Sequence, residues 1–250
     1  MIALITGASS GIGREMAIEL SKQGYDLILV ARRKKKLEEL KKQLDTKVEI
    51  VATDLSSTFN CMKLYHKFEK QPIDVLINNA GFGIFGEFSE TNLDKELDLI
   101  DTNIKALHVL TKLFLKDFKE RDSGYILNVA SSAAFFPGPL MASYYASKAY
   151  VLHLSEAIYE ELKKEGSNVS ISVLCPGPVD TEFNDVAQVR FSLKGLKSNE
   201  VAQYALKKMF QGKLVIVPGF TMKCVHLFNR FIPRKVLLSF TYGIQKKKEG

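Results

Sequence analysis

Two side chains that could exchange a proton with a substrate stand four residues apart near the middle of the sequence. Tyr144 and Lys148 belong to the run Tyr144-Tyr145-Ala146-Ser147-Lys148, which starts a stretch with helical periodicity. On a helix, this spacing places the phenol and the ammonium on one face. A tyrosine ordinarily ionises near pH ~10, and a neighbouring lysine charge lowers that pKa. The pair is a candidate general acid and base, although solvated surface pairs often have the same spacing.

A glycine-rich segment near the N-terminus is a candidate nucleotide site. The apolar run 2–6 predicts a strand, which leads through Thr6-Gly7-Ala8-Ser9-Ser10-Gly11-Ile12-Gly13 into a helical pattern. Glycines let the backbone approach a pyrophosphate, and a helix N-terminus offers it free N–H groups and the positive end of a dipole. The spacing G-x-x-x-G-x-G differs from the dinucleotide fingerprint G-x-G-x-x-G, but its place between strand and helix indicates ligand binding.

Short apolar runs alternate with amphipathic helical stretches along the chain. The predicted strands are residues 2–6, 27–31, 48–52, 75–78, 125–130, 169–175 and 214–217. Continuous apolar strands separated by helices indicate a parallel sheet covered on both faces. We therefore predict a single α/β domain of the doubly wound, Rossmann type, with about seven parallel strands. Residues 176–197 lack clear periodicity and predict a long connection, a kind of segment that often forms a lid.

Length and composition limit the class of protein. The 250 residues, 46% of them hydrophobic, are enough for one domain with a full core. No run approaches the roughly 18 to 20 apolar residues of a membrane span, and the first residues do not resemble a secretory signal, so we expect a cytoplasmic protein. Cys61, Cys175 and Cys224 match no metal-ligand or disulfide spacing, so we expect buried thiols and no metal site.

The net charge of +7 is concentrated at the C-terminus. Residues 221–250 hold seven of the 35 Lys and Arg residues and one of the 28 acidic residues, which accounts for +6 of the total. The pI of about 9.1 therefore describes a basic tail and is no evidence for nucleic-acid binding by the domain.

Four motifs together resemble those of the short-chain dehydrogenase/reductase family. Residues 6–13 match its T-G-x-x-x-G-x-G, residues 78–81 match N-N-A-G, Tyr144 and Lys148 match Y-x-x-x-K, and residues 176–181 match P-G-x-x-x-T. They come in the family's order, and the strand and helix patterns agree to about residue 217. We therefore divide the chain into a dinucleotide-binding oxidoreductase domain, residues 1–217, and a basic amphipathic extension of that domain, residues 218–250.

The resemblance implies four catalytic residues. Ser131 would hold the substrate carbonyl, Tyr144 would transfer the proton, and Lys148 would bind the nicotinamide ribose and tune the tyrosine. Asn103 would support a water relay. Taken alone, each of Ser131 and Asn103 is better explained by capping or ordinary backbone hydrogen bonding, but their joint placement with the other motifs favours the catalytic roles.

Two neighbouring residues compete for these roles. Ser131 is preferred to Ser132 because the family's serine usually lies three residues after the strand asparagine, here Asn128, and thirteen before the tyrosine. Tyr145 is rejected because Ala149, not a lysine, stands four residues after it.

The residues after the second predicted strand indicate which nicotinamide would bind. The strand runs into Arg32-Arg33-Lys34-Lys35-Lys36, with no acidic residue to bind the adenosine ribose hydroxyls. Five cations at the start of a helix oppose its dipole, whereas an arginine that pairs with a 2′-phosphate explains their presence. Arg32 and Arg33 therefore point to NADP(H), and a solvated basic face is the alternative.

The motifs also supply a set of cofactor contacts, in which Asp54 and Leu55 correspond to the family's adenine contact. The set is Thr6, Gly7, Ser9, Ser10, Gly11, Ile12, Gly13, Arg32, Arg33, Asp54, Leu55, Asn79, Ala80, Gly81, Tyr144, Lys148, Pro176, Gly177, Val179 and Thr181.

An apolar small-molecule substrate is suggested by bulky residues that follow strand ends or lie in the long connection, where the crevice of such folds opens. They are Phe82, Phe85, Phe135, Phe136, Leu140, Met141 and Phe183. Each of them is equally well explained as a core residue.

The tail mixes apolar and basic residues, and Pro233 is predicted to separate two short helices within it. The residues are Val225, Leu227, Phe228, Phe231, Ile232, Val236, Leu237, Leu238 and Phe240, with Lys223, Arg230, Arg234 and Lys235. One interpretation is docking on the subunit's own core or on a partner in a homodimer or homotetramer. The other is peripheral contact with an anionic membrane. We favour docking on protein, because apolar helix faces are usually buried.

The sequence thus predicts an NADP(H)-dependent oxidoreductase that interconverts a ketone or aldehyde and its alcohol, with Tyr144 as general acid/base. A non-catalytic nucleotide-binding regulator is one alternative, but it would need the glycine loop and not the four catalytic residues. A membrane-surface lipid ketoreductase is another, and it would differ only in the use of the tail.

Overall fold

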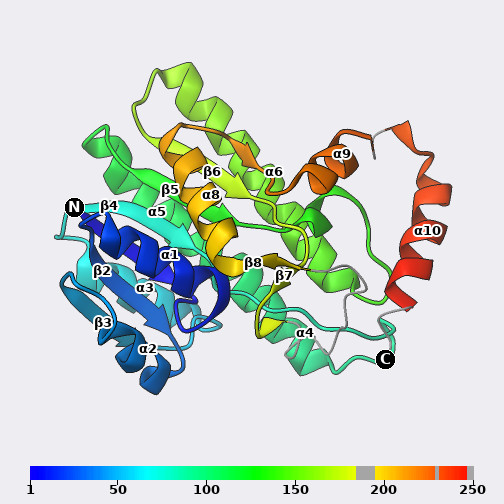
Figure 1. The fold of residues 1–250 in the computed structure, drawn as a ribbon, viewed down its shortest axis with the longest axis horizontal. Helices are drawn as coiled ribbons and strands as arrows, with labels where there is room; N and C mark the ends of the chain where they lie inside the picture. Colours follow the sequence, from blue (N-terminus) through cyan, green and yellow to red (C-terminus); the bar gives the residue numbers. More distant parts are fainter. Residues whose placement is uncertain (184–194, 229–230, 247–250) are drawn as a thin grey trace.

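Seven strands form one parallel sheet in the computed structural model, which describes residues 1–183, 195–228 and 231–246 (Figure 1). The strands are β1 (Ile2–Thr6), β2 (Asp26–Ala31), β3 (Val48–Ala52), β4 (Ile73–Asn78), β5 (Tyr125–Val129), β6 (Ser170–Leu174) and β9 (Val215–Ile216). Their order across the sheet is β3-β2-β1-β4-β5-β6-β9. The predicted doubly wound α/β fold is confirmed, with strand ends that differ from the prediction by one or two residues.

Alternate residues of each strand enter two hydrophobic clusters, one on each face of the sheet. Ala3 and Ile5 of β1 pack in a cluster with Met16, whereas Leu4 between them packs in a cluster with Phe114. Because both faces are covered by helices, the strands read as unbroken apolar runs in the sequence.

Three helices cover each face. The first cluster includes residues of α1 (Gly11–Lys22), α2 (Lys34–Lys41) and α8 (Ser198–Phe210). The second includes residues of α3 (Thr58–Phe68), α5 (Leu107–Glu120) and the C-terminal half of α6 (Ala142–Glu165). Helix α4 (Leu93–Ile100) runs through a π-helical turn, η1 (Asp101–Ala106), directly into α5.

The strand order creates a crevice at the carboxyl end of the sheet. Strand β1 pairs with β2 on one side and with β4 on the other. The chain therefore leaves β1 and β4 in opposite directions, and ligands of such sheets bind at this switch point. The segments that follow β1, β4, β5 and β6 all begin at this end, and they contain the four predicted motifs.

The long connection after β6 contains two short strands, β7 (Val179–Asp180) and β8 (Leu196–Lys197), which pair with each other in parallel. The rest of the predicted connection, residues 184–194, lies outside the described residues. The chain ends in α9 (Phe220–Phe228) and α10 (Arg234–Lys246), so Pro233 separates two helices as predicted. These helices lie at the opposite end of the molecule from the N-terminus (Figure 1).

Helix α10 corrects the expectation that the tail's apolar residues dock on the subunit's own core. Val236, Leu238 and Phe240 are exposed, and so is Phe231 just before the helix. Arg230 and the side chain of Phe228 lie outside the described residues. No helix in the described part of the chain is long and apolar enough to cross a membrane. The division of the chain after residue 217 stays a prediction.

Candidate active site

The glycine loop is held against the end of β4 by hydrogen bonds from the next motif. The Asn79 Nδ2 donates to the carbonyl oxygens of Thr6 and Gly7, both at 3.1 Å. In return, the Thr6 Oγ1 accepts from the backbone N–H groups of Asn79 and Ala80, at 3.0 and 3.1 Å. A Cβ on Gly13 would lie 2.4 Å from the Asn79 Nδ2, so only glycine allows this contact. The two motifs therefore form one rigid unit.

The N-terminus of α1 is open toward the crevice. Its N-cap residue, Ser10, makes no side-chain capping bond, and the first turn contains no acidic residue. The free N–H groups and the positive end of the dipole are therefore available to an anion. Gly7 and Gly11 have φ of 65° and 56°, in the left-handed region that favours glycine. This arrangement fits a pyrophosphate.

A basic cluster lies beside the loop. The Arg33 guanidinium donates to the hydroxyls of Ser9 and Ser10, at 2.9 and 2.8 Å, and forms a 2.6 Å salt bridge with Glu182. Lys36 pairs with the other oxygen of the same carboxylate. The hydrogen bonds from Lys36 and Arg33 lower the pKa of Glu182 to about 2. An anion thus already occupies the cluster, and it comes from the segment after β7.

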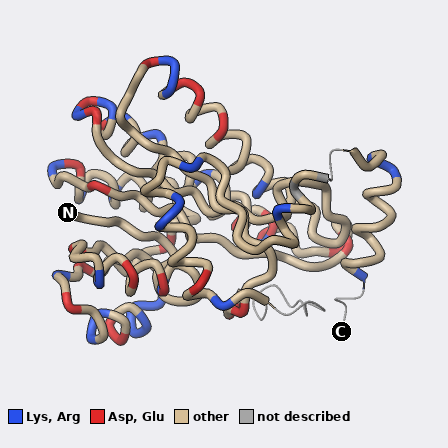
Figure 2. Tube along the Cα trace, turned by 45° about the horizontal axis from the view of Figure 1, so that its top comes forward, with Lys and Arg blue, Asp and Glu red and all other residues tan. Residues whose placement is uncertain are grey.

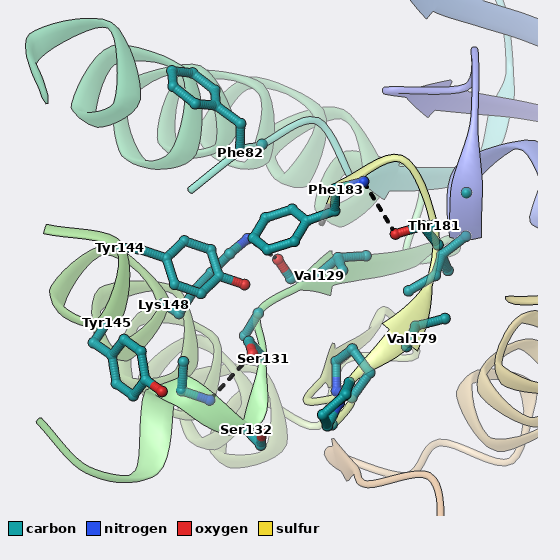
Figure 3. A pocket seen from close by; sticks show the side chains of 18 of the residues that line it. Phe82, Val129, Ser131, Ser132, Tyr144, Tyr145, Lys148, Val179, Thr181 and Phe183 are labelled. Atoms are coloured by element: carbon teal, nitrogen blue, oxygen red, sulfur yellow. Dashed lines mark hydrogen bonds between the residues drawn. The ribbon is translucent and has the colours of Figure 1, made fainter. Parts of the chain in front are cut away.

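The predicted catalytic side chains converge where β5 and the start of α6 meet (Figure 3). The Lys148 Nζ lies 5.8 Å from the centre of the Tyr144 ring and donates to the backbone carbonyl of Val129 at 2.8 Å. The Ser131 Oγ accepts from the Ala133 N–H at 3.1 Å, and the Ser131 side chain is also hydrogen-bonded to Tyr144. Ser131 and Tyr144 thus place two hydroxyl donors at one site.

Burial dominates the ionisation of this pair. It raises the pKa of Tyr144 well above its usual value, and a hydrogen bond with Ser131 acts in the opposite direction. It also lowers the pKa of the Lys148 ammonium to about 8. The pKa of Tyr144 therefore lies above its usual value in the chain by itself and not below it as the sequence suggested, because desolvation is the largest influence on it.

Asn103 lies behind the site and acts through its neighbours. Its Oδ1 accepts from the Phe82 N–H at 3.0 Å, and its Nδ2 donates to the Phe82 carbonyl at 2.9 Å and to the Ser147 Oγ at 3.1 Å. The Ser147 hydroxyl donates to the Tyr144 carbonyl at 2.7 Å. Both amide hydrogens of Asn103 are thus used by the protein. A part for this residue in a water relay stays a prediction.

One cavity of about 840 Å³ unites the predicted residues. It is lined by Gly7, Ser9, Ser10, Gly11, Ile12, Arg32, Arg33, Asp54, Leu55, Asn79, Ala80, Gly81, Ser131, Tyr144, Lys148, Pro176, Gly177, Val179 and Thr181. The remaining three, Thr6, Gly13 and Asn103, do not line it and instead support residues that do.

The predicted apolar substrate residues are divided between cavity and core. Phe82, Phe136, Met141 and Phe183 line the cavity, and the Phe183 ring lies 5.3 Å from that of Tyr144. The other three residues are corrections, because they do not line it. Phe135 packs against the core cluster around Val151, Phe85 packs behind Tyr144, and Leu140 adopts a left-handed turn.

Sequence reasoning missed residues that reach the cavity from distant segments. Glu182 belongs to no motif, and the Y-x-x-x-K spacing selects Tyr144 rather than Tyr145. The Gln245 Nε2 donates to the Tyr145 hydroxyl, while its buried Oε1 has no partner among the described residues. The cavity is also lined by residues of the C-terminal extension: Thr221, Met222, Cys224, Val225, Ile232, Leu237, Phe240, Thr241, Ile244 and Gln245. No pattern in the sequence placed them there.

The family is decided by a match to known sequences. The family model described as short chain dehydrogenase matches residues 1–189. The chain belongs to the short-chain dehydrogenase family. Its members bind a nicotinamide cofactor, and the open N-terminus of α1 together with the glycine cradle fits one in this chain.

Relatives in this family differ in how far they are characterised. An uncharacterized oxidoreductase of Staphylococcus epidermidis is 31% identical over 227 residues, which cover 90% of this chain and 97% of the relative. Very-long-chain 3-oxoacyl-CoA reductase-B of Danio rerio is 32% identical over 192 residues, which cover 74% of this chain and 61% of the relative.

Solved structures of short-chain dehydrogenases superimpose over most of the chain. The enzyme from Sphingobium yanoikuyae in complex with NADPH gives a TM-score of 0.83 at 30% identity, covering 92% of this chain and 93% of that one. An enzyme from Burkholderia phymatum in complex with NAD gives 0.81 at 24% identity, covering 92% of both chains. The two structures contain different nicotinamide cofactors.

The packing of Gly13 generates a first prediction. In Gly13→Ala, the new Cβ would force Asn79 away from Thr6 and Gly7 and break two hydrogen bonds. We expect the affinity for NADPH and NADH, measured by fluorescence titration, to fall about tenfold or more. Gly243→Ala on α10 is the control, because its Cβ would meet no atom within 4 Å. Unchanged affinity in Gly13→Ala would show that Asn79 is not needed to hold the cradle.

The buried ammonium generates a second prediction. Between pH 8 and 10.5, the unfolded chain keeps a proton on Lys148 that the folded chain has lost, so folding stability contributed by this group rises with pH in this window. Relative to Lys148→Met, the wild type should gain up to about 3 kcal/mol in free energy of unfolding from below pH 8 to above pH 10.5. Chemical denaturation of both proteins at several pH values measures this. Parallel curves would contradict desolvation of Lys148.

Proposed function

We propose that the protein is an NADP(H)-dependent oxidoreductase that interconverts an apolar ketone or aldehyde and its alcohol. The observation that carries the proposal is the convergence of Tyr144, Ser131 and Lys148 in a cavity continuous with the glycine cradle. We include in it the expected cytoplasmic location and a homodimeric or homotetrameric assembly.

Each catalytic residue has a role that follows from its position. The nicotinamide, when bound, supplies or accepts the hydride. Ser131 donates a hydrogen bond to the substrate oxygen, on which charge develops, and Tyr144 transfers the proton to or from that oxygen. Among the described residues, the Lys148 ammonium donates only to Val129, so two of its N–H groups are left to hold the ribose hydroxyls. Asn103 positions the loop and the helix on either side.

The raised pKa of Tyr144 suits the direction of reduction. A buried phenol that is protonated at neutral pH is ready to donate its proton to a nascent alkoxide. For oxidation, the tyrosinate must be favoured by charge that enters with the ligands, because burial opposes it.

NADP(H) is supported by the cluster around Arg33. A guanidinium flanked by the hydroxyls of Ser9 and Ser10 is a site for a phosphate, and Glu182 shows that it accepts an anion. Arg32 lines the same part of the cavity, and none of the hydrogen bonds among the described residues uses it. It would add a second, more mobile charge.

An apolar substrate is supported by the walls of the cavity near Tyr144. Phe82, Met141 and Phe183 line the cavity and pack in one cluster with Tyr144. Phe136, Ile232 and Leu237 line the same cavity. Burying an apolar group against these side chains favours binding by removing it from water. The zebrafish relative is named for a very-long-chain 3-oxoacyl-CoA, a ketone whose acyl chain is apolar.

A non-catalytic regulator would not need this constellation. Binding a dinucleotide requires the cradle, whereas desolvating both Tyr144 and Lys148 costs free energy that binding alone does not repay. The acid and base therefore favour an enzyme.

Replacement of the proton donor tests the catalytic assignment. Tyr144→Phe should lower turnover of NADPH with a panel of ketones and aldehydes by about 10²-fold or more, because proton transfer is lost. NADPH affinity should stay nearly unchanged. The matched control is Tyr150→Phe, on the same helix and 37% exposed, which should retain full activity. A Tyr144→Phe enzyme with about a tenth of wild-type activity would contradict the role of Tyr144.

Two substitutions with opposite effects test the cofactor assignment. Arg33→Ala should weaken NADPH binding about tenfold or more and leave NADH binding nearly unchanged, because only NADPH has the 2′-phosphate. Glu182→Gln should strengthen NADPH binding, because it removes the anion that competes for Arg33. Titration of the wild type and both variants with each cofactor measures this. Equal affinity of the wild type for NADPH and NADH would exclude the assignment.

A further inference from the structure

The two buried residues of helix α10 are polar, and several of its apolar residues are exposed. Thr241 and Gln245, one turn apart, are 4% and 1% exposed. Val236, Phe240 and Ile244, which are also spaced by one turn, are 59%, 65% and 44% exposed. A helix that packs only on the core of its own subunit presents these two sides in the opposite way. Something other than the described chain must therefore cover the apolar side.

The exposed side chains of α10 belong to a larger apolar surface, which we call the C-terminal surface. Nine of the fifteen large hydrophobic residues that are exposed in the described chain lie within this one short part of the sequence. They are Phe220, Leu227, Phe231, Ile232, Val236, Leu238, Phe240, Tyr242 and Ile244. Exposed apolar side chains gathered in this way mark an interaction site.

The charge of this surface has one sign. Residues 218–246 contain no Asp or Glu, whereas Lys223, Arg234, Lys235 and Lys246 are exposed there. Acidic and basic residues are intermixed at the opposite end of the molecule (Figure 2). Two copies of such a surface repel each other when they meet face to face, whereas an anionic lipid surface attracts it. The charge of the C-terminal surface therefore favours contact with an anionic bilayer over contact with a second copy of the same surface.

The C-terminal surface also borders the cavity. Ile232, Phe240 and Ile244 are exposed and at the same time line the cavity that contains Tyr144. The hydrogen bond from Gln245 to Tyr145 ties α10 to the start of α6, next to the catalytic tyrosine. A bilayer at this surface would therefore meet the apolar end of the cavity.

We propose that α9 and α10 dock on an anionic phospholipid bilayer, with Phe231, Val236 and Phe240 entering the acyl boundary and the basic residues contacting the headgroups. Because no described helix can span a membrane, the contact is peripheral. The docking itself does not depend on the proposed function, but if both hold, apolar substrates reach Tyr144 from the lipid phase.

The absence of tryptophan from the sequence allows a direct experiment. Phe231→Trp in the full chain introduces one reporter at a position that is 73% exposed and does not line the cavity. Vesicles of equal parts phosphatidylglycerol and phosphatidylcholine should shift its emission to the blue, as the indole enters an apolar medium. Pure phosphatidylcholine vesicles should bind at least about tenfold more weakly. Phe59→Trp on α3, at 74% exposure, is the matched control and should not shift.

Other outcomes would overturn the proposal. They are no shift with either vesicle, an equal shift in Phe59→Trp, or a shift that depends on protein concentration without lipid, which would assign the surface to a second copy of the chain. Adding Lys235→Glu and Val236→Ser to the reporter should weaken binding to anionic vesicles, and high salt should do the same. None of these measurements requires turnover, so docking and catalysis can fail separately.

Discussion

The segment from Asn79 to Phe82 holds the two halves of the site in register. On one side, the Asn79 amide binds the carbonyls of the glycine loop. On the other, the backbone of Phe82 binds Asn103, whose amide reaches Ser147 on the catalytic helix. A single hydrogen-bonded line thus runs from the cofactor cradle to Tyr144. Each of these hydrogen bonds is buried or half-buried, so breaking one leaves unpaired polar groups and affects both the cofactor cradle and the catalytic helix.

This rigidity matters because the chemistry depends on groups that burial makes costly. Tyr144 and Lys148 are both almost fully buried, and neither is paired with an opposite charge among the described residues. The Val129 carbonyl gives the Lys148 ammonium one partner, and desolvation lowers the pKa of Lys148 to about 8. The folded chain therefore bears the cost of burying these two groups. Bound ligands can reduce that cost, because their hydroxyl and carbonyl groups offer hydrogen-bond partners to Tyr144 and Lys148.

Much of the fold and of the site could be predicted from the sequence because the responsible signals are local. The apolar run 2–6 is a strand whose two faces enter different core clusters, and Gly13 lies where a Cβ would collide with the Asn79 side chain. Glu182 and Gln245 could not be predicted. Each reaches the cavity from a segment far from its partner in sequence, Glu182 at Arg33 and Gln245 at Tyr145, and neither position has a periodicity or a motif that marks it.

The surroundings of α10 could not be predicted from the sequence, for a different physical reason. The sequence of α10 is amphipathic. An amphipathic pattern indicates that the apolar side of a helix is covered, but it does not indicate which molecule or segment covers it. Thr241 and Gln245 form the inner side, where the Gln245 Nε2 donates to the Tyr145 hydroxyl. The apolar side is then left at the mouth of the cavity. Ile232, Phe240 and Ile244 line the cavity and are exposed to water, and contact with an apolar ligand or an apolar medium would remove them from water.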